Sequence, residues 1–514
     1  MNMTYNIKNK IIIKNTLFLY FRMILTLVIT LYSSRIVLKT LGVEDFGIYN
    51  IVGGVVTMLT FISGAMTSAT QRFLSFEIGK DNKEKLSKTF IMSINIHIMI
   101  IICIFIIAET AGLWLINNYL IIGSDRIKAA NIVFQYSLLS FCFTILSTPY
   151  KANIIAHEKM NIFAYIGIID VFLKLIAVLM LEYILGDKLI IYSILISIIS
   201  ISIYLILLAY NRLNFDTTKY KFYWNRKLFF SLFSYTGWNL FGNMASVGMN
   251  QGINILLNIF FGPIVNAARA ISFQVNNAIN GFVINLQSAL SPQIVKSYAK
   301  NDISYLENLV LLGSKYSFFL ILILSLPILL KPDIVLSLWL GNYPAYTSIF
   351  CQLILIDSLI NSLSSSLMTA FQASGKIKKY QITIGSILLL NIPISYFLLS
   401  YGFEAKITFS VSIVLSLISL IVRLFLLNEL FPGISDKFYK TIFWRVIAIF
   451  SISYTLSWFI TKDLKNDLFN FILTCITSWS FLIINIVFLG LTKNERLKVK
   501  NILVKKYIKF KENK

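Results

Sequence analysis

The sequence predicts an all-α membrane protein of about 14 transmembrane helices, arranged as two pseudo-symmetric six-helix lobes and two C-terminal helices. Three observations support this fold class. Of the 514 residues, 57% are hydrophobic and 13% are charged, which excludes an ordinary soluble domain. Apolar segments long enough to cross a bilayer recur from end to end. Residues 39–82 also resemble residues 259–302 at an offset of 220, without a gap.

The apolar segments are expected to form membrane-spanning helices, since about 20 mainly apolar residues cross the hydrocarbon core. The expected spans are 15–38, 46–68, 89–116, 129–150, 161–183, 189–210, 228–258, 267–290, 313–331, 347–371, 380–400, 405–427, 441–461 and 467–490. Those between residues 228 and 290 are the most polar. The first span lacks a small-residue cleavage site after it, so we expect an uncleaved helix and not a signal peptide.

The internal repeat defines the two lobes. Its register is 220 residues at first and 217 further along. Matching positions are Gly42 and Gly262, Gly79 and Ala299, Asp81 and Asn301, Ala156 and Ala373, and Lys159 and Lys376. The repeated unit is six helices long, so both copies enter the bilayer in the same orientation. We expect a pseudo-two-fold axis along the membrane normal, an arrangement typical of transporters.

The basic residues predict the topology. The net charge is +23, and most of the 46 Lys and Arg residues fall on one set of alternate connectors. The positive-inside rule then places both termini in the cytoplasm, and we expect no nucleic-acid partner. The expected segments are an N-lobe at 1–210, a cytoplasmic connector at 211–227, a C-lobe at 228–430, two further spans within 431–490, and a basic cytoplasmic tail at 491–514.

Polar stripes run along three of the expected helices. Asn239, Asn243, Asn250, Asn254 and Asn258 fall within about 100° of arc on one helix face. Arg269, Asn276, Asn280 and Gln287 fall within about 40° on the next helix, and Asn15, Arg22, Thr26 and Ser33 form a third stripe. Such side chains must face protein or water. They either join helices by hydrogen bonds or line a hydrated cavity; stripes along two adjacent helices favour the cavity.

Charged residues within the spans are the next candidates. Arg22 lies too deep in the first span for a simple end anchor, although snorkelling toward the surface is the alternative. Arg269 begins the second stripe, and Arg35 lies near the outer end of the first span. Lys174 follows Asp170 by one helical turn, which favours an intrahelical ion pair over a site. Arginine side chains match phosphate oxygens well.

Asp357 is the best candidate for coupling transport to protons or cations. It precedes Asn361 by one turn near a run of serines, but the sequence indicates no charged partner for it. Asp125 and Asp187 are interpreted as solvated loop acids. The chain has no phosphate-binding loop motif, no metal-ligand spacing among its four cysteines, and no acid/base pair in an outer loop. We therefore expect no cofactor, no metal and no enzymatic activity.

Several segments together resemble a known family. They are the first span with Arg22, the turn LGVEDFGIY at 41–49, the loop from Gln71-Arg72-Phe73 to Gly79-Lys80, Phe261-Gly262-Pro263, and Ala156-His157-Glu158-Lys159. The chain resembles the polysaccharide flippases (Wzx-like O-antigen and capsule transporters) of the multidrug/oligosaccharidyl-lipid/polysaccharide (MOP) exporter superfamily. The resemblance covers about residues 10–430.

The resemblance implies a flippase that works by alternating access in the bacterial cytoplasmic (inner) membrane. Its substrate would be an undecaprenyl-pyrophosphate-linked oligosaccharide repeat unit, as in O-antigen and lipopolysaccharide biosynthesis. Cationic residues would contact the pyrophosphate or acidic sugars. Arg22 and Arg269 are the main candidates here, and Arg35 and Lys174 are secondary ones. A polysaccharide polymerase and a chain-length regulator are implied partners, membrane lipid surrounds the chain, and we expect a monomer.

Three alternatives remain. A multidrug/cation antiporter of the same fold would prefer acidic cavity residues, whereas the bases within the spans outnumber the acids. A lipid II flippase matches the expected number of helices. A membrane scaffold or a catalytic glycan enzyme would either carry a catalytic pair in an outer loop or lack a continuous cavity.

Overall fold

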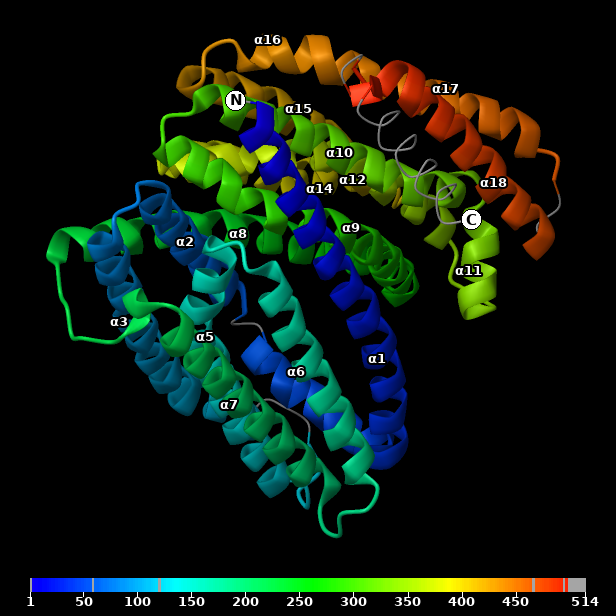
Figure 1. Ribbon diagram of the computed structural model, residues 1–514. Helices are drawn as coiled ribbons and strands as arrows, with labels where there is room; N and C mark the ends of the chain where they lie inside the picture. The colour runs from blue at the N-terminus through cyan, green and yellow to red at the C-terminus, as the bar shows by residue number, and fades with distance from the viewer. Residues whose placement is uncertain (1, 58–59, 119–121, 465–466, 493–494, 498–514) are drawn as a thin grey trace, which may run out of the picture. The chain divides into compact units, whose positions relative to one another are not determined.

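The computed structural model describes residues 2–57, 60–118, 122–464, 467–492 and 495–497, and within them it contains helices and no β-strand (Figure 1). Eleven helical stretches of the described chain are long and apolar enough to cross a membrane. Of the three other expected spans, 228–258 and 267–290 fall on helices that are more polar. The described residues of the third, 46–57 and 60–68, belong to two successive helices. The predicted all-α membrane fold is confirmed.

The helices of the first copy follow one another with short connections. They are α1 (Asn2–Thr57), α2 (Thr60–Gly79), α3 (Lys83–Ile107), a π-helical turn (Ala108–Gly112), α4 (Leu113–Asn118), α5 (Ile127–Ala156), α6 (Met160–Leu181) and α7 (Lys188–Asn214). α1 is two helices joined at Gly42, whose backbone is not helical. A 3₁₀ turn (Asp216–Thr218) lies within the connector to the second copy.

The second copy and the C-terminal helices continue the pattern. They are α8 (Arg226–Phe261), α9 (Pro263–Ala299), α10 (Ile303–Leu330), α11 (Pro332–Leu340), α12 (Thr347–Ser374), α13 (Ile377–Leu389), α14 (Asn391–Ser400), α15 (Ile407–Leu430), α16 (Ile434–Phe438), a π-helical turn (Tyr439–Phe443), α17 (Trp444–Thr461), α18 (Leu468–Asn485) and a final π-helical turn (Ile486–Gly490). The expected basic tail at 491–514 lies largely outside the described residues.

The repeat is visible in the backbone of the turns. Three pairs of matching residues share a positive φ, a range of backbone conformation that side-chain-bearing residues rarely adopt. The pairs, with φ in degrees, are Gly42 (79) and Gly262 (77), Asp81 (54) and Asn301 (56), and Glu158 (61) and Gly375 (77). Matching helix caps follow the second pair. Asn82 Oδ1 accepts from the amide of Lys85 at 2.9 Å, and Asp302 Oδ1 from that of Tyr305 at 3.2 Å.

The described chain forms two compact units. Unit 1 comprises Met1–Met244, Ser288–Leu306 and Phe371–Ile382, and unit 2 comprises Ala245–Gln287, Glu307–Ala370 and Thr383–Lys514. Unit 1 therefore holds the first copy together with the first part of α8 and the ends of α9, α10, α12 and α13. Within it, α5 packs against α7 and α2, and α1 packs along α6 (Figure 1).

An arginine ties one end of unit 1 together. Arg126, just before α5, donates to the carboxylates of Asp45 and, at 2.7 Å, Asp187. Asp187 also caps α7 through the amide of Leu189. The interpretation of Asp187 as a solvated loop acid is therefore wrong, because its carboxylate is paired with Arg126. The two residues are 61 positions apart, so the sequence did not indicate the pair. The hydrogen bond that Arg126 donates to Asp45, opposed by burial, raises the pKa of Arg126 above its usual value.

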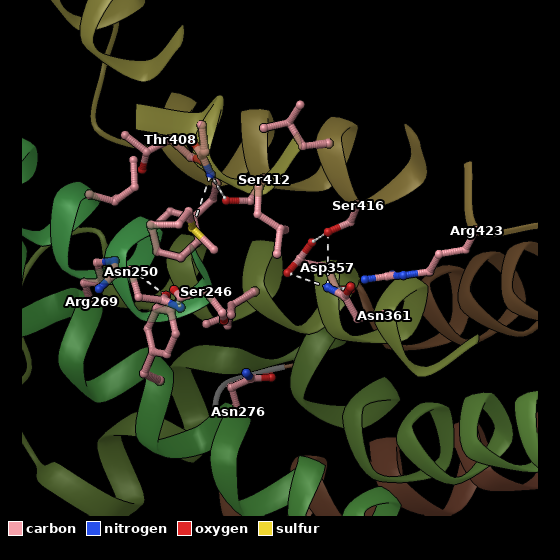
Figure 2. Close-up of a pocket in the computed structure, with 18 residues that line it drawn as sticks. Ser246, Asn250, Arg269, Asn276, Asp357, Asn361, Thr408, Ser412, Ser416 and Arg423 are labelled. Atoms are coloured by element: carbon pink, nitrogen blue, oxygen red, sulfur yellow. Dashed lines mark hydrogen bonds between the residues drawn. The ribbon is translucent and has the colours of Figure 1, made fainter. Parts of the chain in front are cut away.

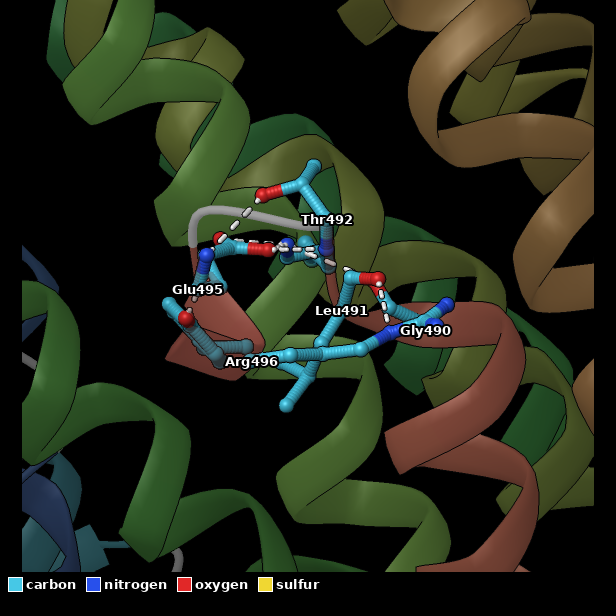
Figure 3. A network of polar contacts seen from close by, with 7 residues as sticks. Gly490, Leu491, Thr492, Glu495 and Arg496 are labelled. Atoms are coloured by element: carbon cyan, nitrogen blue, oxygen red, sulfur yellow. Dashed lines mark hydrogen bonds and ion pairs between the residues drawn. The ribbon is translucent and has the colours of Figure 1, made fainter. Parts of the chain in front are cut away.

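In unit 2 the segment after α18 is anchored to α10. Lys315 Nζ donates to both carboxylate oxygens of Glu495, at 2.7 and 2.8 Å, and the Thr492 amide donates to the same carboxylate at 2.7 Å (Figure 3). Burial alone would raise the pKa of Glu495, but these bonds outweigh it and hold that pKa below its usual value. The anchor fixes where the chain leaves the last apolar helix.

Candidate functional site

A polar cavity of about 290 Å³ lies inside unit 2, between α8, α9, α12, α14 and α15 (Figure 2). Its polar lining residues are Ser246, Asn250, Arg269, Asn276, Asp357, Asn361, Asn391, Thr408, Ser412, Ser416 and Arg423. Apolar side chains, among them Met249 and Phe273, complete the wall. Polar groups at this density inside apolar helices require water, a ligand or each other.

Arg269 is the most exceptional group in this cavity, because it is buried without a counter-ion. It is 6% exposed and donates through Nη1 to Asn254 Oδ1 and through Nη2 to Asn250 Oδ1, the latter at 3.1 Å. The guanidinium also lies 4.3 Å from the ring centre of Phe273. Among the described residues no carboxylate pairs with Arg269, and its buried Nε has no hydrogen-bond partner. Neutral amides orient the charge but do not cancel it.

The two asparagines that hold Arg269 stand one turn apart on α8, as the predicted stripe requires. The stripe of α8 therefore faces the beginning of the stripe of α9, and both contribute to one cavity in unit 2. Asn250 and Arg269 line the cavity, whereas Asn254 holds the arginine without being one of the lining residues. These three predicted site residues are brought together as a group. Their role as substrate contacts stays a prediction.

Asp357 faces the same cavity from α12 and has three partners, of which the sequence indicated only Asn361, one turn later. Ser416 on α15 donates to its Oδ1 at 2.6 Å, and Asn361 donates to its Oδ2 at 3.0 Å. The side chain of Arg423 extends toward this pair and lies within electrostatic range of the carboxylate (Figure 2). Arg423 was visible in the sequence as a charge within a span, but nothing there related α15 to α12.

The remaining residues of the α9 stripe divide between the two interpretations. Asn276 lines the cavity, and its Oδ1 accepts from Asn280 at 2.9 Å and from Ser358 at 2.5 Å. Gln287, further along, donates to Ser366 at 2.9 Å. Asn280 and Gln287 thus bond α9 to α12, as expected for helix–helix hydrogen bonding, and only the first part of the stripe faces the cavity.

Asn239 and Asn243 belong to unit 1. Asn239 is buried, and its Oδ1 accepts from Gln381 Nε2 at 3.0 Å. The amide nitrogen of Asn243 lies 3.9 Å from the point where a Cβ on Gly64 would stand. Neither residue lines the cavity of unit 2. The α8 stripe is therefore shared between the units, which periodicity along one helix could not reveal.

Basic residues of unit 1 form a second group, on α1, α5 and α6. The Arg22 guanidinium lies 4.5 Å from the ring centre of Phe163, and a Cβ on Gly167 would approach its Cδ to 2.7 Å. α6 therefore presents a flat ring and a bare backbone to Arg22. The arginine packs against protein here, which argues against simple snorkelling.

Lys151, which the sequence did not single out, joins this group. It lies within electrostatic range of Arg22, Lys174 and Asp170. Lys174 donates to Asp170 at 2.9 Å, as the one-turn spacing predicted. Arg35 is exposed, and no described contact joins it to this group. Lys151 was overlooked because it stands at the edge of its expected span, where a basic residue is typical of a connector.

Comparison with known proteins gives the fold an independent reference. No family model and no curated protein sequence matches the chain. Among solved structures, an outward-facing multidrug resistance MATE family transporter of the MOP superfamily matches with a TM-score of 0.72 and 13% identity, over 84% of this chain and 96% of that chain. The chain has the fold of the MATE transporters.

Two further structures agree. A MATE protein in complex with MaD3S matches with a TM-score of 0.72 and 12% identity, over 84% of this chain and 97% of that chain. A MOP superfamily transporter from Pyrococcus furiosus, described by the reverse polarity of its binding pocket, matches with a TM-score of 0.69 and 13% identity, over 81% and 95%. At this identity the likeness to the MATE proteins establishes the fold alone.

Proposed function

We propose that the protein is a membrane transporter that flips lipid-linked oligosaccharides carried on undecaprenyl pyrophosphate. The observation that carries this proposal is Arg269, a buried guanidinium held by two neutral amides at the wall of a polar cavity. An uncompensated charge inside apolar helices costs several kcal/mol unless a counter-ion or water meets it. A pyrophosphate supplies that counter-ion during each cycle and departs with the substrate.

The residues that line the cavity suit the part that all such substrates share, which is the diphosphate and the sugar next to it. A guanidinium fork binds phosphate oxygens in two places at once. Asn276, Ser246 and Ser412 offer donors and acceptors suited to sugar hydroxyls. A cavity of about 290 Å³ lies near the lower end for small-ligand sites, so we assign to it the diphosphate and the adjoining sugar, not a complete repeat unit.

A multidrug/cation antiporter is the second candidate, and a specific residue favours it. Asp357 faces the same cavity, where a carboxylate suits a cationic drug, a proton or a metal cation. Against it, Arg423 and Arg269 line the cavity with Asp357, so the bases outnumber the acids two to one. The fold does not decide between these substrates, because one neighbour is a multidrug resistance transporter and another has a pocket of reverse polarity. A lipid II flippase would differ only in the glycan.

The test uses cells from which this gene is deleted. We would extract the lipid-linked oligosaccharides and determine which leaflet they occupy. The flippase is supported if an intact repeat unit accumulates in the cytoplasmic leaflet and if the wild-type chain restores its movement to the other leaflet. The accumulated unit then identifies the cargo. The Arg269→Ala variant should not restore this movement, although the amount of the protein in the membrane is unchanged. Arg226→Ala, at the exposed start of α8, should behave as wild type.

The same strains separate the two candidates. A normal leaflet distribution, together with altered drug sensitivity that depends on Asp357, would replace the flippase with the antiporter. In a flippase driven by an ion gradient, Asp357→Asn should instead leave cargo binding intact and remove the dependence of export on that gradient. Export by Asp357→Asn with unchanged gradient dependence would exclude this residue from coupling.

A further inference from the structure

Residues at equivalent positions of the repeat touch one another in unit 1. Gln71 on α2 donates through Nε2 to Ser291 Oγ on α9 at 3.3 Å, and the two residues stand 220 positions apart, the offset of the repeat. Eight residues later the next matching pair meets, because a Cβ on Gly79 would lie 2.7 Å from the Cβ of Ala299. Two copies can touch at identical positions only at their symmetry axis, so the local axis passes between α2 and α9.

The contact between these helices is a close seam, in which most of the residues are small. Positions 71, 75 and 79 lie on one face of α2, and 291, 295 and 299 lie on the matching face of α9. The middle pair, Ser75 and Val295, is 0% and 2% exposed. A Cβ on Gly79 would also stand 3.0 Å from the backbone of Lys296, so glycine is what permits this approach.

A first polar latch holds the end of α9. The Glu158 carboxylate accepts from Lys296 Nζ and Gln293 Nε2, and it is 13% exposed. The backbone oxygen of Glu158 accepts from Asn15 Nδ2 on α1 at 3.2 Å. The turn between α5 and α6 is thereby bound to α9 on one side and to α1 on the other. Burial lowers the pKa of Lys296, and the bond to Glu158 opposes this effect.

A second latch holds α2. Arg72 donates through Nε to the backbone oxygen of Gln372 at 3.2 Å, and through Nη2 to that of Ala373 at 3.0 Å. Its guanidinium lies 4.7 Å from the ring centre of Phe73 and 5.6 Å from that of Tyr235. These carbonyls end α12, where the helix dipole favours a cation.

The two latches are counterparts in the repeat. One joins the end of α9 to the turn after α5, and the other joins α2 to the last residues of α12, directly before the turn that follows it. Glu158 and Gly375 occupy the same position in those turns. The glutamate supplies a carboxylate to Lys296, whereas the glycine leaves room for Arg72, since a Cβ there would stand 2.7 Å from Arg72 Nη2. The two equivalent contacts therefore use different groups, an ion pair in one and an arginine bound to backbone carbonyls in the other.

We propose that this seam and its two latches form the inner gate of the transporter, closed in this structure. Opening separates α2 from α9 about the local axis and breaks both latches together. The polar groups that opening exposes (a carboxylate, two cations, carbonyls, Gln71, Ser75 and Ser291) are ones that water solvates well, which offsets the exposure of the apolar Val295 and Ala299. The proposal rests on the proposed transport function, and the distribution of basic residues predicts that this end faces the cytoplasm.

The test reads the gate without requiring any cargo. Cys103, Cys142, Cys351 and Cys475 are replaced by serine in the full chain, and Ser75→Cys is introduced in the middle of the seam. Inside-out vesicles are then treated with a charged maleimide. Glu158→Gly and Arg72→Gln should each speed labelling about tenfold, because hydrogen bonds to charged groups are lost, and the double variant should label fastest.

A matched control and a second measurement keep the result decisive. Glu307→Gln breaks an ion pair with Lys437 in unit 2 and should leave the labelling rate unchanged. In the opposite direction, oxidation of a Ser75→Cys/Val295→Cys pair should stop export, and a reductant should restore it. The gate proposal is overturned if the cysteine of Ser75→Cys is labelled rapidly in the parent protein. It is also overturned if neither latch variant changes the labelling rate. Full export by the cross-linked protein overturns it as well.

The two proposals fail in distinguishable ways. If the unlinked parent moves no lipid-linked glycan while the latch variants still accelerate labelling, the gate stands and the cargo assignment falls. If glycan export depends on Arg269 but the labelling rates do not respond, the cargo assignment stands and the gate falls.

Discussion

Glu158 holds a left-handed backbone conformation, with φ of 61°, at the repeat position where Gly375 has φ of 77°. Glycine adopts this conformation freely, whereas a glutamate loses about 1–2 kcal/mol to steric conflict. The glutamate side chain offsets this cost by binding Lys296 and Gln293. The first copy of the repeat therefore accepts backbone strain in exchange for a side-chain contact that its counterpart lacks.

Two substitutions at Glu158 separate strain from contact. Both Glu158→Gly and Glu158→Ala remove the carboxylate and leave Lys296 without its ion pair, so both should unfold at a lower temperature than the wild type. The alanine variant keeps the strained conformation and should be less stable than the glycine variant by about 1 kcal/mol. Thermal unfolding in detergent measures the difference. Equal stability of the two variants would mean that the turn relaxes and stores no strain.

Asn254→Asp provides a sharper test of Arg269 than its removal. The change is nearly isosteric and places a carboxylate where an amide oxygen now accepts from Arg269. The buried arginine then has a permanent counter-ion, so stability should rise. Export should fall at least about tenfold, because the substrate anion must compete with the new carboxylate for the same guanidinium fork. Thermal unfolding and glycan export are measured on the same preparation.

Asn280→Asp is the matched control for that substitution. Asn280 bonds to Asn276 and Ser358 and has no described cation beside it. A carboxylate there is buried without a counter-ion, so stability should fall. If Asn254→Asp stabilises the protein and export continues at the wild-type rate, then Arg269 is a structural residue and does not meet the cargo.

The sequence was sufficient to predict the fold. Hydropathy is a local signal, and a repeat at a fixed offset can be read directly along the chain. The matching turns at Asp81 and Asn301, with nearly equal φ angles, follow from the same alignment. The site was predicted only in part. The α8 and α9 stripes identified Arg269 and its asparagines, because helical period alone brings them to one face. Periodicity does not say which helix faces which.

Contacts across long sequence separations explain what was not predicted. Asp357 meets Ser416, 59 residues later, and Arg72 meets carbonyls 300 residues later. The offset of 220 contained the information that Gln71 and Ser291 are equivalent, but not that the axis passes between them. A repeat gives the symmetry operation, and only packing locates its axis.

Gly79→Ala should open the seam between α2 and α9. The added methyl group would stand 2.7 Å from the Ala299 Cβ and 3.0 Å from the Lys296 backbone, and backbone cannot yield as a flexible side chain would. Overpacking of this kind costs about 1–3 kcal/mol. We expect lower thermal stability and faster labelling of a cysteine at position 75.

Gly237→Ala on α8 is the corresponding control. A Cβ there would meet nothing within 4 Å, so the substitution should be neutral or stabilise the helix by up to about 1 kcal/mol. If Gly79→Ala behaves in the same way as Gly237→Ala, the seam is looser than the contacts indicate and does not close by direct helix contact.

His157 should make the protein less stable in mild acid. Its ring packs against Phe215, with 4.3 Å between ring centres, and its Nδ1 bonds to the backbone oxygen of Asn153 at 2.9 Å. Burial lowers the pKa of His157, the bond to Asn153 opposes this, and Lys296 and Lys159 lower the pKa further. The unfolded chain, with a histidine pKa of about 6.5, therefore binds a proton at a higher pH than the folded chain does.

The sign of the pH effect follows from that difference. Stability is fully present above about pH 6.5 and declines as the pH falls through that value toward the lower pKa of the folded state. Unfolding temperatures at about pH 7.5 and about pH 5.0, on either side of the histidine pKa, should differ more for the wild type than for His157→Gln. His97 remains in both proteins, so the difference isolates His157. Equal pH dependence would show that protonated His157 is accommodated in the folded turn, and the neighbouring latch would then be insensitive to acid.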